Sequence, residues 1–400
     1  MNLTGIITEY NPLHKGHIYH IESAKKITKC DGVICIMSGN FVQRGAPALI
    51  SKWDRAKTAL ESGVDIVIEL PLVYSLSSAE FFAFGSVSLL NNLGSVNNLC
   101  FGSESGDINL IYKLAEILSK EPEEFKHYLK LYLSSGLSYP IARGKALAHI
   151  FSNDLDVIEI IKHSNNILAI EYCKSLVRLN SSITPSTITR VGSSYNSIDL
   201  KKDFSSATSI RSYLRYAKTL EPLKNTVPLS SYSMLSKHYN DKTLTFEDSI
   251  FRYIKHKALT SKNNFENLPD VSEGLHNKLY KALYTSNSYE ELINTVKSKR
   301  YTYTRISRIL CQYFIGFENY NTEELRRTPS EYARVLGFNS RGREILREIK
   351  NTSSIPIYTK LPKTLSPMLQ LDLQGTRAYS TVNKNISPDS DFLISPIRLF

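Results

Sequence analysis

Short apolar runs alternate with amphipathic stretches over the first hundred residues of the chain. This is the pattern of strand, helix and strand units in a parallel sheet, in which each helix crosses over between two strands. After residue 110 the apolar positions recur mostly with a helical period. We predict strands at residues 4–9, 32–38, 64–70, 97–101 and 186–191, and helices at residues 17–28, 52–62, 77–91, 158–176, 207–218, 251–259, 275–283, 289–297 and 305–314.

The predicted order of elements divides the chain into two parts. We expect residues 1–218 to form an α/β domain with a doubly wound, Rossmann-like parallel sheet, whose ligands bind at the carboxyl ends of the strands. Residues 221–239 contain two prolines and many serines, which is the composition of a linker. We expect residues 219–400 to form a mostly α-helical domain, and the pattern predicts no element after residue 356.

Composition narrows the class of protein. No apolar run approaches the roughly 20 residues of a membrane span, and the sequence after Met1 lacks the basic region and cleavage site of a secretory signal. The five cysteines are scattered and never form a C-x-x-C pair, so we expect reduced thiols, with neither disulfides nor a structural zinc site. We therefore expect a cytoplasmic protein without a membrane partner or a metal site of its own, and no protein partner is implied.

Positive charge is concentrated in the second half of the chain. Residues 201–400 hold 31 Lys and Arg against 19 Asp and Glu, whereas residues 1–200 hold 18 against 19. Lysine and arginine gain affinity for polyanions by releasing condensed counterions, so the second half is a candidate RNA-binding region. A basic surface that only faces solvent is the alternative interpretation.

One segment of the second half, residues 297–308, interleaves cations with aromatic rings. Such a mixture binds phosphates and stacks on unpaired bases. Residues 326–327 and 341–343 add further positive charge. A solvated helix face would carry similar residues. The candidate RNA-binding residues are Lys299, Arg300, Tyr303, Arg305 and Arg308.

The segment from Glu9 to His17, EYNPLHKGH, lies where the first predicted strand gives way to the first predicted helix. A nucleotide bound there would meet the free N–H groups and the positive dipole end of the helix. His14 and His17 are three residues apart, so both can lie on one face and donate hydrogen bonds to phosphate oxygens. Gly16 lacks a side chain that would keep the nucleotide away. Histidines with this spacing are often purely structural, but the strand, turn and helix context favours a phosphate site.

The H-x-G-H pattern resembles the signature of the nucleotidyltransferase superfamily, in which ATP is attacked at its α-phosphate and pyrophosphate leaves. The wider sequence is similar to the bacterial tRNA(Met) cytidine acetate ligase family. The similarity covers nearly the whole chain, and it is specific up to Arg211 and looser beyond. It is carried by EYNP-x-H-x-G-H and by residues 37–45, 51–53, 63–71, 101–104, 164–168, 187–192, 206–211, 303–308 and 334–339.

The resemblance implies a function for each part. Residues 1–218 would be a nucleotidyltransferase-like, ATP-binding catalytic domain and residues 219–400 a basic RNA-binding domain. Members of the family make acetyl-adenylate from acetate and ATP, and then acetylate the exocyclic amine of the wobble cytidine of elongator tRNA(Met). ATP, acetate and this tRNA would be the substrates, and Mg²⁺ would be carried by the nucleotide.

The resemblance also implies which residues act. His14 and His17 would be catalytic. Ser164 stands where the family commonly has proline, so the resemblance does not decide between Asn165 and Asn166. The implied ATP contacts are Ile7, Thr8, Glu9, Tyr10, Asn11, Pro12, Gly16, His17, His20, Gly102, Asn165, Asn166, Arg190, Ser206, Thr208 and Arg211.

Several of these positions have a second interpretation. Gly102 ends a predicted strand and would let a base or ribose lie against the backbone, but turns also use glycine. Arg190 could pair with phosphate through its planar fork, or it could be a surface arginine. Ser206 and Thr208 open a predicted helix that suits the β- and γ-phosphates, yet both residue types cap helices that bind nothing.

Two cations flank the loop after the second predicted strand. Arg44 and Lys52 could reach substrate or phosphate, but lone cations near loops are usually solvated. We hold them as weaker candidates than the residues above.

The chemistry of phosphoryl transfer requires positioned charge and no protein nucleophile. An acetate oxygen would attack the α-phosphate in line, while His14 and His17 stabilise the charge on the phosphate oxygens. Two other functions fit the sequence. One is a nucleotidyltransferase that moves AMP to a small metabolite without RNA, which leaves the basic half unexplained. The other is a non-catalytic RNA-binding protein, which would not need the two histidines.

Overall fold

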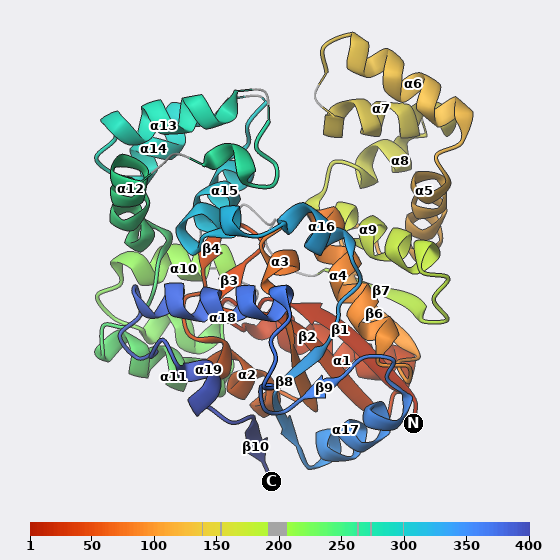
Figure 1. Ribbon diagram of the computed structural model, residues 1–400. Coiled ribbons are helices and arrows are strands. Elements are labelled where there is room, and N and C mark those ends of the chain that lie inside the picture. The colour runs from red at the N-terminus through yellow and green to blue at the C-terminus, as the bar shows by residue number, and fades with distance from the viewer. Residues whose placement is uncertain (138, 153, 191–205, 262–263, 273, 299) are drawn as a thin grey trace.

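The computed structural model of this chain describes residues 1–400 except 138, 153, 191–205, 262–263, 273 and 299. A mainly parallel sheet of eight strands lies at the centre of the described chain, with helices on both faces (Figure 1). Its order is β10, β8, β5, β2, β1, β6, β7, and β9 pairs with β8, while β3 and β4 form a separate hairpin. The strands are β1 (Leu3–Thr8), β2 (Gly32–Ser38), β3 (Phe41–Val42), β4 (Ala46–Pro47), β5 (Ile66–Leu70), β6 (Asn98–Ser103), β7 (Thr184–Thr189), β8 (Ala333–Asn339), β9 (Ile357–Tyr358) and β10 (Ile397–Leu399).

Helices fill the connections between the strands. Up to β7 and the helix after it they are α1 (Lys15–Thr28), α2 (Lys52–Glu61), α3 (Leu72–Ser75), α4 (Ala79–Asn92), α5 (Ile108–Lys120), α6 (Glu123–Ser134), α7 (Tyr139–Ile150), α8 (Leu155–Ile160), α9 (Ser164–Arg178) and α10 (Ala207–Tyr216). The remainder are α11 (Leu229–Asn240), α12 (Phe251–Thr260), α13 (Leu275–Thr285), α14 (Tyr289–Val296), α15 (Tyr303–Ile315), α16 (Thr322–Arg327), α17 (Ser340–Thr352), α18 (Pro367–Ser380) and α19 (Ser390–Leu393). Within the described ranges, no helix is both long and apolar enough to cross a membrane.

The central strands are buried on both sides because their side chains alternate between two cores. On β2, Val33 and Cys35 pack with apolar residues of α1 and α2. Ile34 and Ile36 belong to the core on the other face, which also contains residues of α4, α9 and α17. Near-continuous apolar runs are therefore required here, and this is why the first strands were predictable from the sequence. The predicted doubly wound α/β fold is confirmed.

Two predictions in the first 240 residues are wrong. The helix predicted at residues 158–176 is two helices, α8 and α9, which are separated by a turn ending at His163. The segment predicted as a linker, residues 221–239, contains most of α11, since Pro228 stands at the N-cap of that helix. Proline at a helix start removes only an N–H group that has no partner within the helix, so it begins α11 rather than breaking it.

Residues 219–400 are mostly helical, but they also complete the sheet. β8 pairs antiparallel with β5, and β10 and β9 each pair parallel with β8. In Figure 1 the blue C-terminal segments return to the sheet, while α12 to α15 lie at the upper left and α5 to α8 at the upper right. The sequence analysis missed these strands. The division of the chain at residue 218 stays a prediction.

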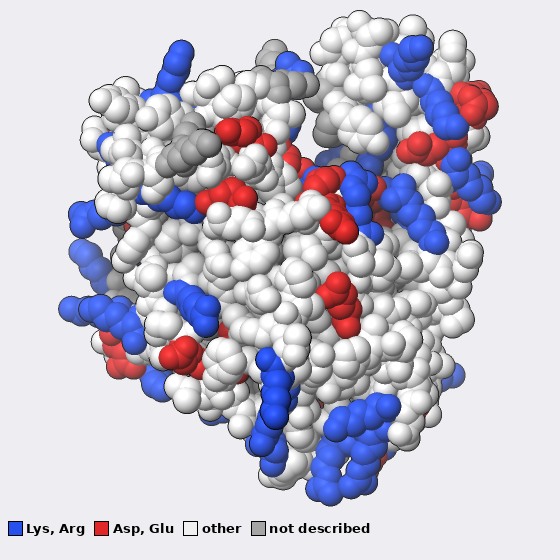
Figure 2. All heavy atoms as spheres, viewed as in Figure 1, with Lys and Arg blue, Asp and Glu red and all other residues white. Residues whose placement is uncertain are grey.

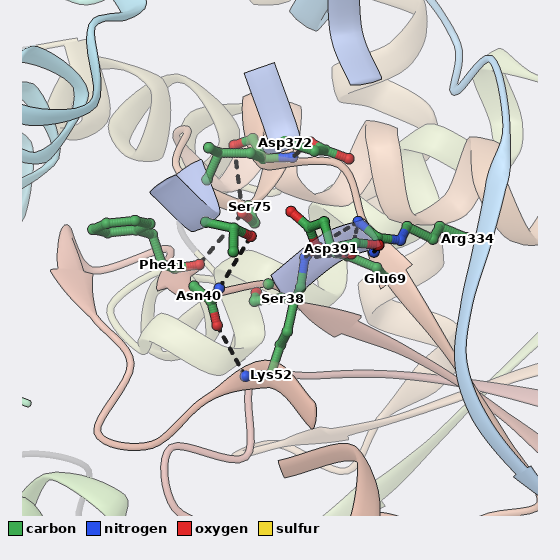
Figure 3. A network of polar contacts seen from close by, with 12 residues as sticks. Ser38, Asn40, Phe41, Lys52, Glu69, Ser75, Arg334, Asp372 and Asp391 are labelled. Atoms are coloured by element: carbon green, nitrogen blue, oxygen red, sulfur yellow. Dashed lines mark hydrogen bonds and ion pairs between the residues drawn. The ribbon is translucent and has the colours of Figure 1, made fainter. Parts of the chain in front are cut away.

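A buried cluster of four charged side chains joins the late strands to the early ones (Figure 3). Lys52 Nζ lies 2.7 Å from Glu69 Oε1 and 2.8 Å from Asp391 Oδ1. Arg334 Nη1 lies 2.8 Å from Asp391 Oδ1 and 3.4 Å from Glu69 Oε2. Two cations and two carboxylates neutralise one another, which is the condition for burying charge. Lys52 therefore belongs to this cluster, and its expected contact with substrate or phosphate is not supported.

Removal of one carboxylate from this cluster should destabilise the fold. Asp391→Ala leaves Lys52 and Arg334 with one carboxylate between them, so we expect the free energy of unfolding to fall by about 3–5 kcal/mol. Urea denaturation followed by circular dichroism measures this change. Asp389→Ala, which removes an exposed carboxylate two residues away, is the control and should change stability by less than about 0.5 kcal/mol. Equal effects of the two substitutions would contradict the role of the cluster.

Candidate active site

One pocket lies at the carboxyl ends of β1 and β6, beside the first turns of α1 and α10. Nearly all of the predicted ATP contacts meet there, although they come from five separate stretches of the chain. Pro12, Gly16 and Asn166 are predicted contacts that lie outside the lining found among the described residues. The predicted residues in the lining are Ile7, Thr8, Glu9, Tyr10, Asn11, His14, His17, His20, Gly102, Asn165, Arg190, Ser206, Thr208 and Arg211.

Part of the pocket wall is apolar and was missed by the sequence analysis. Phe82, Phe101, Leu168 and Tyr172 line it, and the ring centroids of Phe101 and Tyr172 are 5.6 Å apart. Three of these residues lie within apolar helices, where nothing in a single sequence separates a pocket wall from the core. Phe101 precedes Gly102 and was the one position with a local signal. An apolar wall of this kind suits a base or the methyl group of a small acid.

The two signature histidines stack on each other at the start of α1. Their ring centroids are 3.7 Å apart, and the ring of Tyr10 meets His17 edge-on at 4.9 Å. The backbone N–H of His14 donates to Nδ1 of His17 over 3.2 Å. Since Nδ1 accepts, the proton of a neutral His17 ring must be on Nε2, which becomes the free donor. Among the described residues, Nδ1 of His14 is buried without a hydrogen-bond partner.

All three histidines of the pocket are held neutral. Burial, assisted by the positive charges of Arg190 and Arg211, lowers the pKa of His14 from 6.5 to about 3. Burial also lowers the pKa of His20 to about 4. It lowers the pKa of His17 well below its usual value, with the neighbouring His14 contributing. A bound polyanion would raise these pKa values again, because it favours the charged form.

Arg55 organises the ends of β1 and β2 beneath the pocket. Its side chain is fully buried, and Nη1 donates to the carbonyl oxygens of Glu9 and Ser38 over 2.6 and 3.0 Å. Nη2 donates to the carbonyl oxygen of Gly39, and Nε donates to that of Ile50. A guanidinium presents donors in a fixed planar fork, so it sets the relative positions of these backbone segments. The sequence analysis did not single out this residue.

Arg211 connects the two phosphate-binding segments implied by the resemblance. Its Nη1 donates to the carbonyl oxygen of Asn11 over 2.7 Å, and its Nη2 donates to Oγ1 of Thr208 over 3.3 Å. Ser206 is the N-cap of α10, and its hydroxyl accepts from the backbone N–H of Ser209. Ser206 therefore does cap the helix, as the alternative interpretation proposed, and it lines the pocket as well.

Asn165 and Asn166 have different positions relative to the pocket. Asn166 is buried, and its Oδ1 accepts from the backbone N–H groups of Glu104 and Ser105. Glu104 in turn accepts from the backbone N–H of Asn166 and from Nδ2 of Asn165. Asn166 thus holds the loop after β6 against the start of α9. Asn165 is the one of the two that lines the pocket.

Gly102 lines the pocket and lies close to the stem of Arg190. A Cβ atom at this position would lie 3.1 Å from Cγ of Arg190, which is a tight contact. Arg190 itself is exposed to solvent and lines the pocket. A side chain at position 102 would therefore press on the stem of Arg190 beside the pocket.

The hairpin of β3 and β4 links the pocket to α15. Glu9 Oε1 accepts from the backbone N–H of Gln43 at the hairpin tip over 2.7 Å. Gly45 follows with a φ of +81°, and a Cβ atom there would lie 2.2 Å from the backbone nitrogen of Arg308. Only glycine tolerates both this φ and this close approach. Arg44, a weaker candidate in the sequence, lies in the pocket lining beside Gln43.

The candidate RNA-binding residues do not form one surface. Lys299 lies outside the described residues. Arg305 donates to the carbonyl oxygen of Asp270, whereas Arg300 and Tyr303 are exposed and Arg308 is partly buried. Arg326 pairs with Asp270 and Glu323. In Figure 2 cations also gather over α17, which begins beside the amino ends of β2 and β5, opposite the ends that hold the pocket. The expected RNA contacts at the first group stay a prediction.

A family model described as HIGH Nucleotidyl Transferase matches residues 1–391 of the chain. A tRNA(Met) cytidine acetate ligase of Clostridium novyi is 62% identical over 399 residues, covering 100% of both chains, and one of Clostridium tetani is 51% identical, covering 99% of this chain and 100% of the relative. The chain therefore belongs to the HIGH nucleotidyl transferases, and within them to the tRNA(Met) cytidine acetate ligase family.

The fold agrees with that of solved relatives. The apo crystal structure of Thermotoga maritima TmcAL is 35% identical and matches with a TM-score of 0.92, with both chains fully covered. A second structure of that protein, bound with alpha-thio ATP, matches with a TM-score of 0.91 at the same identity and coverage.

The neutral histidines make the stability of the folded protein depend on pH. His20 has a pKa of about 4 in the folded chain and about 6.5 when unfolded, so between these values the unfolded chain binds more protons. Stability is therefore present above about pH 6.5 and is lost as the pH falls toward 4. We expect His20→Gln, which cannot titrate, to reduce the slope of unfolding free energy against pH by up to about 1.4 kcal/mol per pH unit around pH 5. Urea denaturation between pH 4.5 and 7 tests this, and a variant with the wild-type slope would refute it.

Proposed function

We propose that this chain ligates acetate to a cytidine of tRNA(Met) at the expense of ATP, with acetyl-adenylate as the intermediate. The observation that carries the proposal is the meeting of the stacked pair His14 and His17, Arg190 and the first turn of α10 in one pocket. The relationship to tRNA(Met) cytidine acetate ligases over the full chain supports the identity of the acceptor and of the acid. The reaction belongs in the cytoplasm, where tRNA is modified.

The pocket suits attack at the α-phosphate. An acetate oxygen attacks phosphorus in line, the bond to the bridging oxygen breaks, and pyrophosphate leaves. His17 offers Nε2–H to the oxygens on which charge builds up, and its tautomer is set in advance by the N–H of His14. The first turn of α10, with Thr208, lines the pocket and would supply N–H and hydroxyl groups to the β- and γ-phosphates. A Mg²⁺ ion carried by the nucleotide would neutralise part of the charge on those phosphates.

The second step transfers the acyl group. The exocyclic amine of cytidine attacks the carbonyl carbon of acetyl-adenylate, the bond between that carbon and the phosphate oxygen breaks, and AMP and one proton are released. The acyl-adenylate must be shielded from water until the amine arrives, which favours RNA closing over the pocket. The pocket residues bind and orient both reactants, and no covalent intermediate on the protein is required.

Loss of the His17 ring should slow the reaction strongly. His17→Ala removes the donor whose tautomer is fixed, so we expect the rate of ATP-dependent transfer of radiolabel from acetate to a tRNA(Met) transcript to fall by about 100- to 1,000-fold. His127→Ala removes an exposed histidine of α6 and should have the wild-type rate. A folded, ATP-binding wild-type protein that transfers no label would instead support a nucleotidyltransferase acting on a small metabolite.

The neighbouring asparagines should have separable effects. Asn165→Ala alters the pocket wall, so we expect the KM for ATP to rise about 3- to 10-fold with little change in stability. Asn166→Ala leaves two backbone N–H groups without their acceptor, so we expect the free energy of unfolding to fall by about 1–3 kcal/mol. Steady-state kinetics and urea denaturation of both variants test the assignment. A larger effect of Asn166→Ala than of Asn165→Ala on the KM for ATP, at full stability, would reverse it.

A further inference from the structure

A second cavity opens beside the nucleotide pocket and shares part of its wall. Gln43, Arg44, Asn165 and Leu168 line both cavities. The far side of the second cavity is formed by Thr304 and Arg308 of α15. Ala79, Ser164 and Ile167 complete the lining. We call this cavity the acceptor groove. It joins the nucleotide pocket to the segment in which the sequence interleaves cations and aromatic rings.

The size of the acceptor groove limits what it can hold. Its volume is about 220 Å³, which corresponds to about seven water molecules at roughly 30 Å³ each. A pyrimidine base of eight non-hydrogen atoms has a similar size, whereas a second nucleoside triphosphate is much larger. The groove therefore suits a single base or a small acid.

Arg308 contributes a positive charge to the acceptor groove. Its Nε is buried and has no hydrogen-bond partner among the described residues, although the residue as a whole is partly exposed. Burial lowers the pKa of Arg308 from its usual value, yet the side chain stays charged at neutral pH because an arginine pKa starts above 12. An unpaired buried donor on a cation favours an anionic ligand, since leaving it unpaired costs free energy.

The groove is also held in a fixed position relative to the reacting atoms. Glu9, in the nucleotide pocket, accepts from the backbone of Gln43. Gly45 then packs directly on the backbone of α15 at Ser307 and Arg308. One short hairpin therefore sets the distance between the nucleotide pocket and Arg308, as a two-substrate reaction requires.

We propose that the acceptor groove receives the cytidine, with its base directed toward the nucleotide pocket between Leu168 and Gln43 and its phosphate bound by Arg308. This inference rests on the proposed function, because it presumes an RNA acceptor. A base that lies in a single-stranded loop can be turned out into such a cavity at modest cost. Arg308 is then an acceptor-binding residue, which contacts the RNA and takes no part in forming the adenylate.

The two half-reactions test this assignment separately. Acetate-dependent exchange of labelled pyrophosphate into ATP, measured without RNA, reports on adenylate formation. Transfer of labelled acetate to a tRNA(Met) transcript reports on both steps. For Arg308→Gln we expect exchange within about twofold of wild type, with kcat/KM for the tRNA lowered about 10- to 100-fold. The salt dependence of the KM for tRNA should also become shallower by about one unit of slope.

Two further variants complete the test. Arg343→Gln removes an exposed cation of α17, which begins beside the amino ends of β2 and β5, and we expect it to retain most of the wild-type kcat/KM. Thr304→Phe fills the groove from α15 without removing a charge, so it should block transfer and leave exchange intact even if Arg308→Gln fails to fold.

Each contrary outcome has one meaning. Equal losses of exchange and transfer in Arg308→Gln would place acetate or pyrophosphate in the groove and overturn the inference. Unchanged transfer in both Arg308→Gln and Thr304→Phe would show that the groove is not used. Equal effects of Arg308→Gln and Arg343→Gln on kcat/KM for the tRNA would mean that Arg308 contributes only to the overall positive charge of the protein. Absence of acetate-dependent exchange in the wild-type protein would instead overturn the proposed function itself.

Discussion

The buried charge cluster of Lys52, Glu69, Arg334 and Asp391 is the constraint on which the rest of the fold depends. Its members come from α2, β5, β8 and α19, which span most of the chain length. Buried ions are tolerated only when they are paired, so the late strands must join the sheet that the first hundred residues begin. The helices between residues 219 and 330 are consequently anchored at both ends, and α15 is held beside the hairpin that borders the pocket.

The pocket itself depends on backbone atoms that are positioned by side chains beneath it. Arg55 holds the carbonyl ends of β1 and β2, and Arg211 holds Asn11 against α10. Burial keeps His14 and His17 neutral. Their rings are stacked, and Nδ1 of His14 has no hydrogen-bond partner among the described residues. Preorganised donors of this kind are what the proposed attack of acetate on phosphorus requires.

Much of the fold and the site was predictable because the determining signals are local. Strands buried on both faces are continuous apolar runs, and the signature histidines stand at a strand end. The remainder depends on partners distant in sequence. Lys52 looked like a loop cation because Asp391 is 339 positions away. β8 was missed because the strands that it pairs with, β5 and β10, are distant from it in the sequence. Asn165 and Asn166 could be told apart only from their hydrogen bonds to Glu104 and the loop after β6. α11 was missed because it begins after a proline, which the sequence analysis took as a sign of a linker.

The order in which these partners occur in the chain has a consequence during synthesis. When the first 218 residues have left the ribosome, they include every pocket residue named above, from Ile7 to Arg211. They do not include Arg334 or Asp391, so Lys52 and Glu69 meet as an isolated buried pair and β5 is an edge strand with exposed backbone groups. The pocket therefore acquires a stable support only once residues as far as Asp391 have emerged, and a chain that stops before that point should be a target for chaperones and proteases.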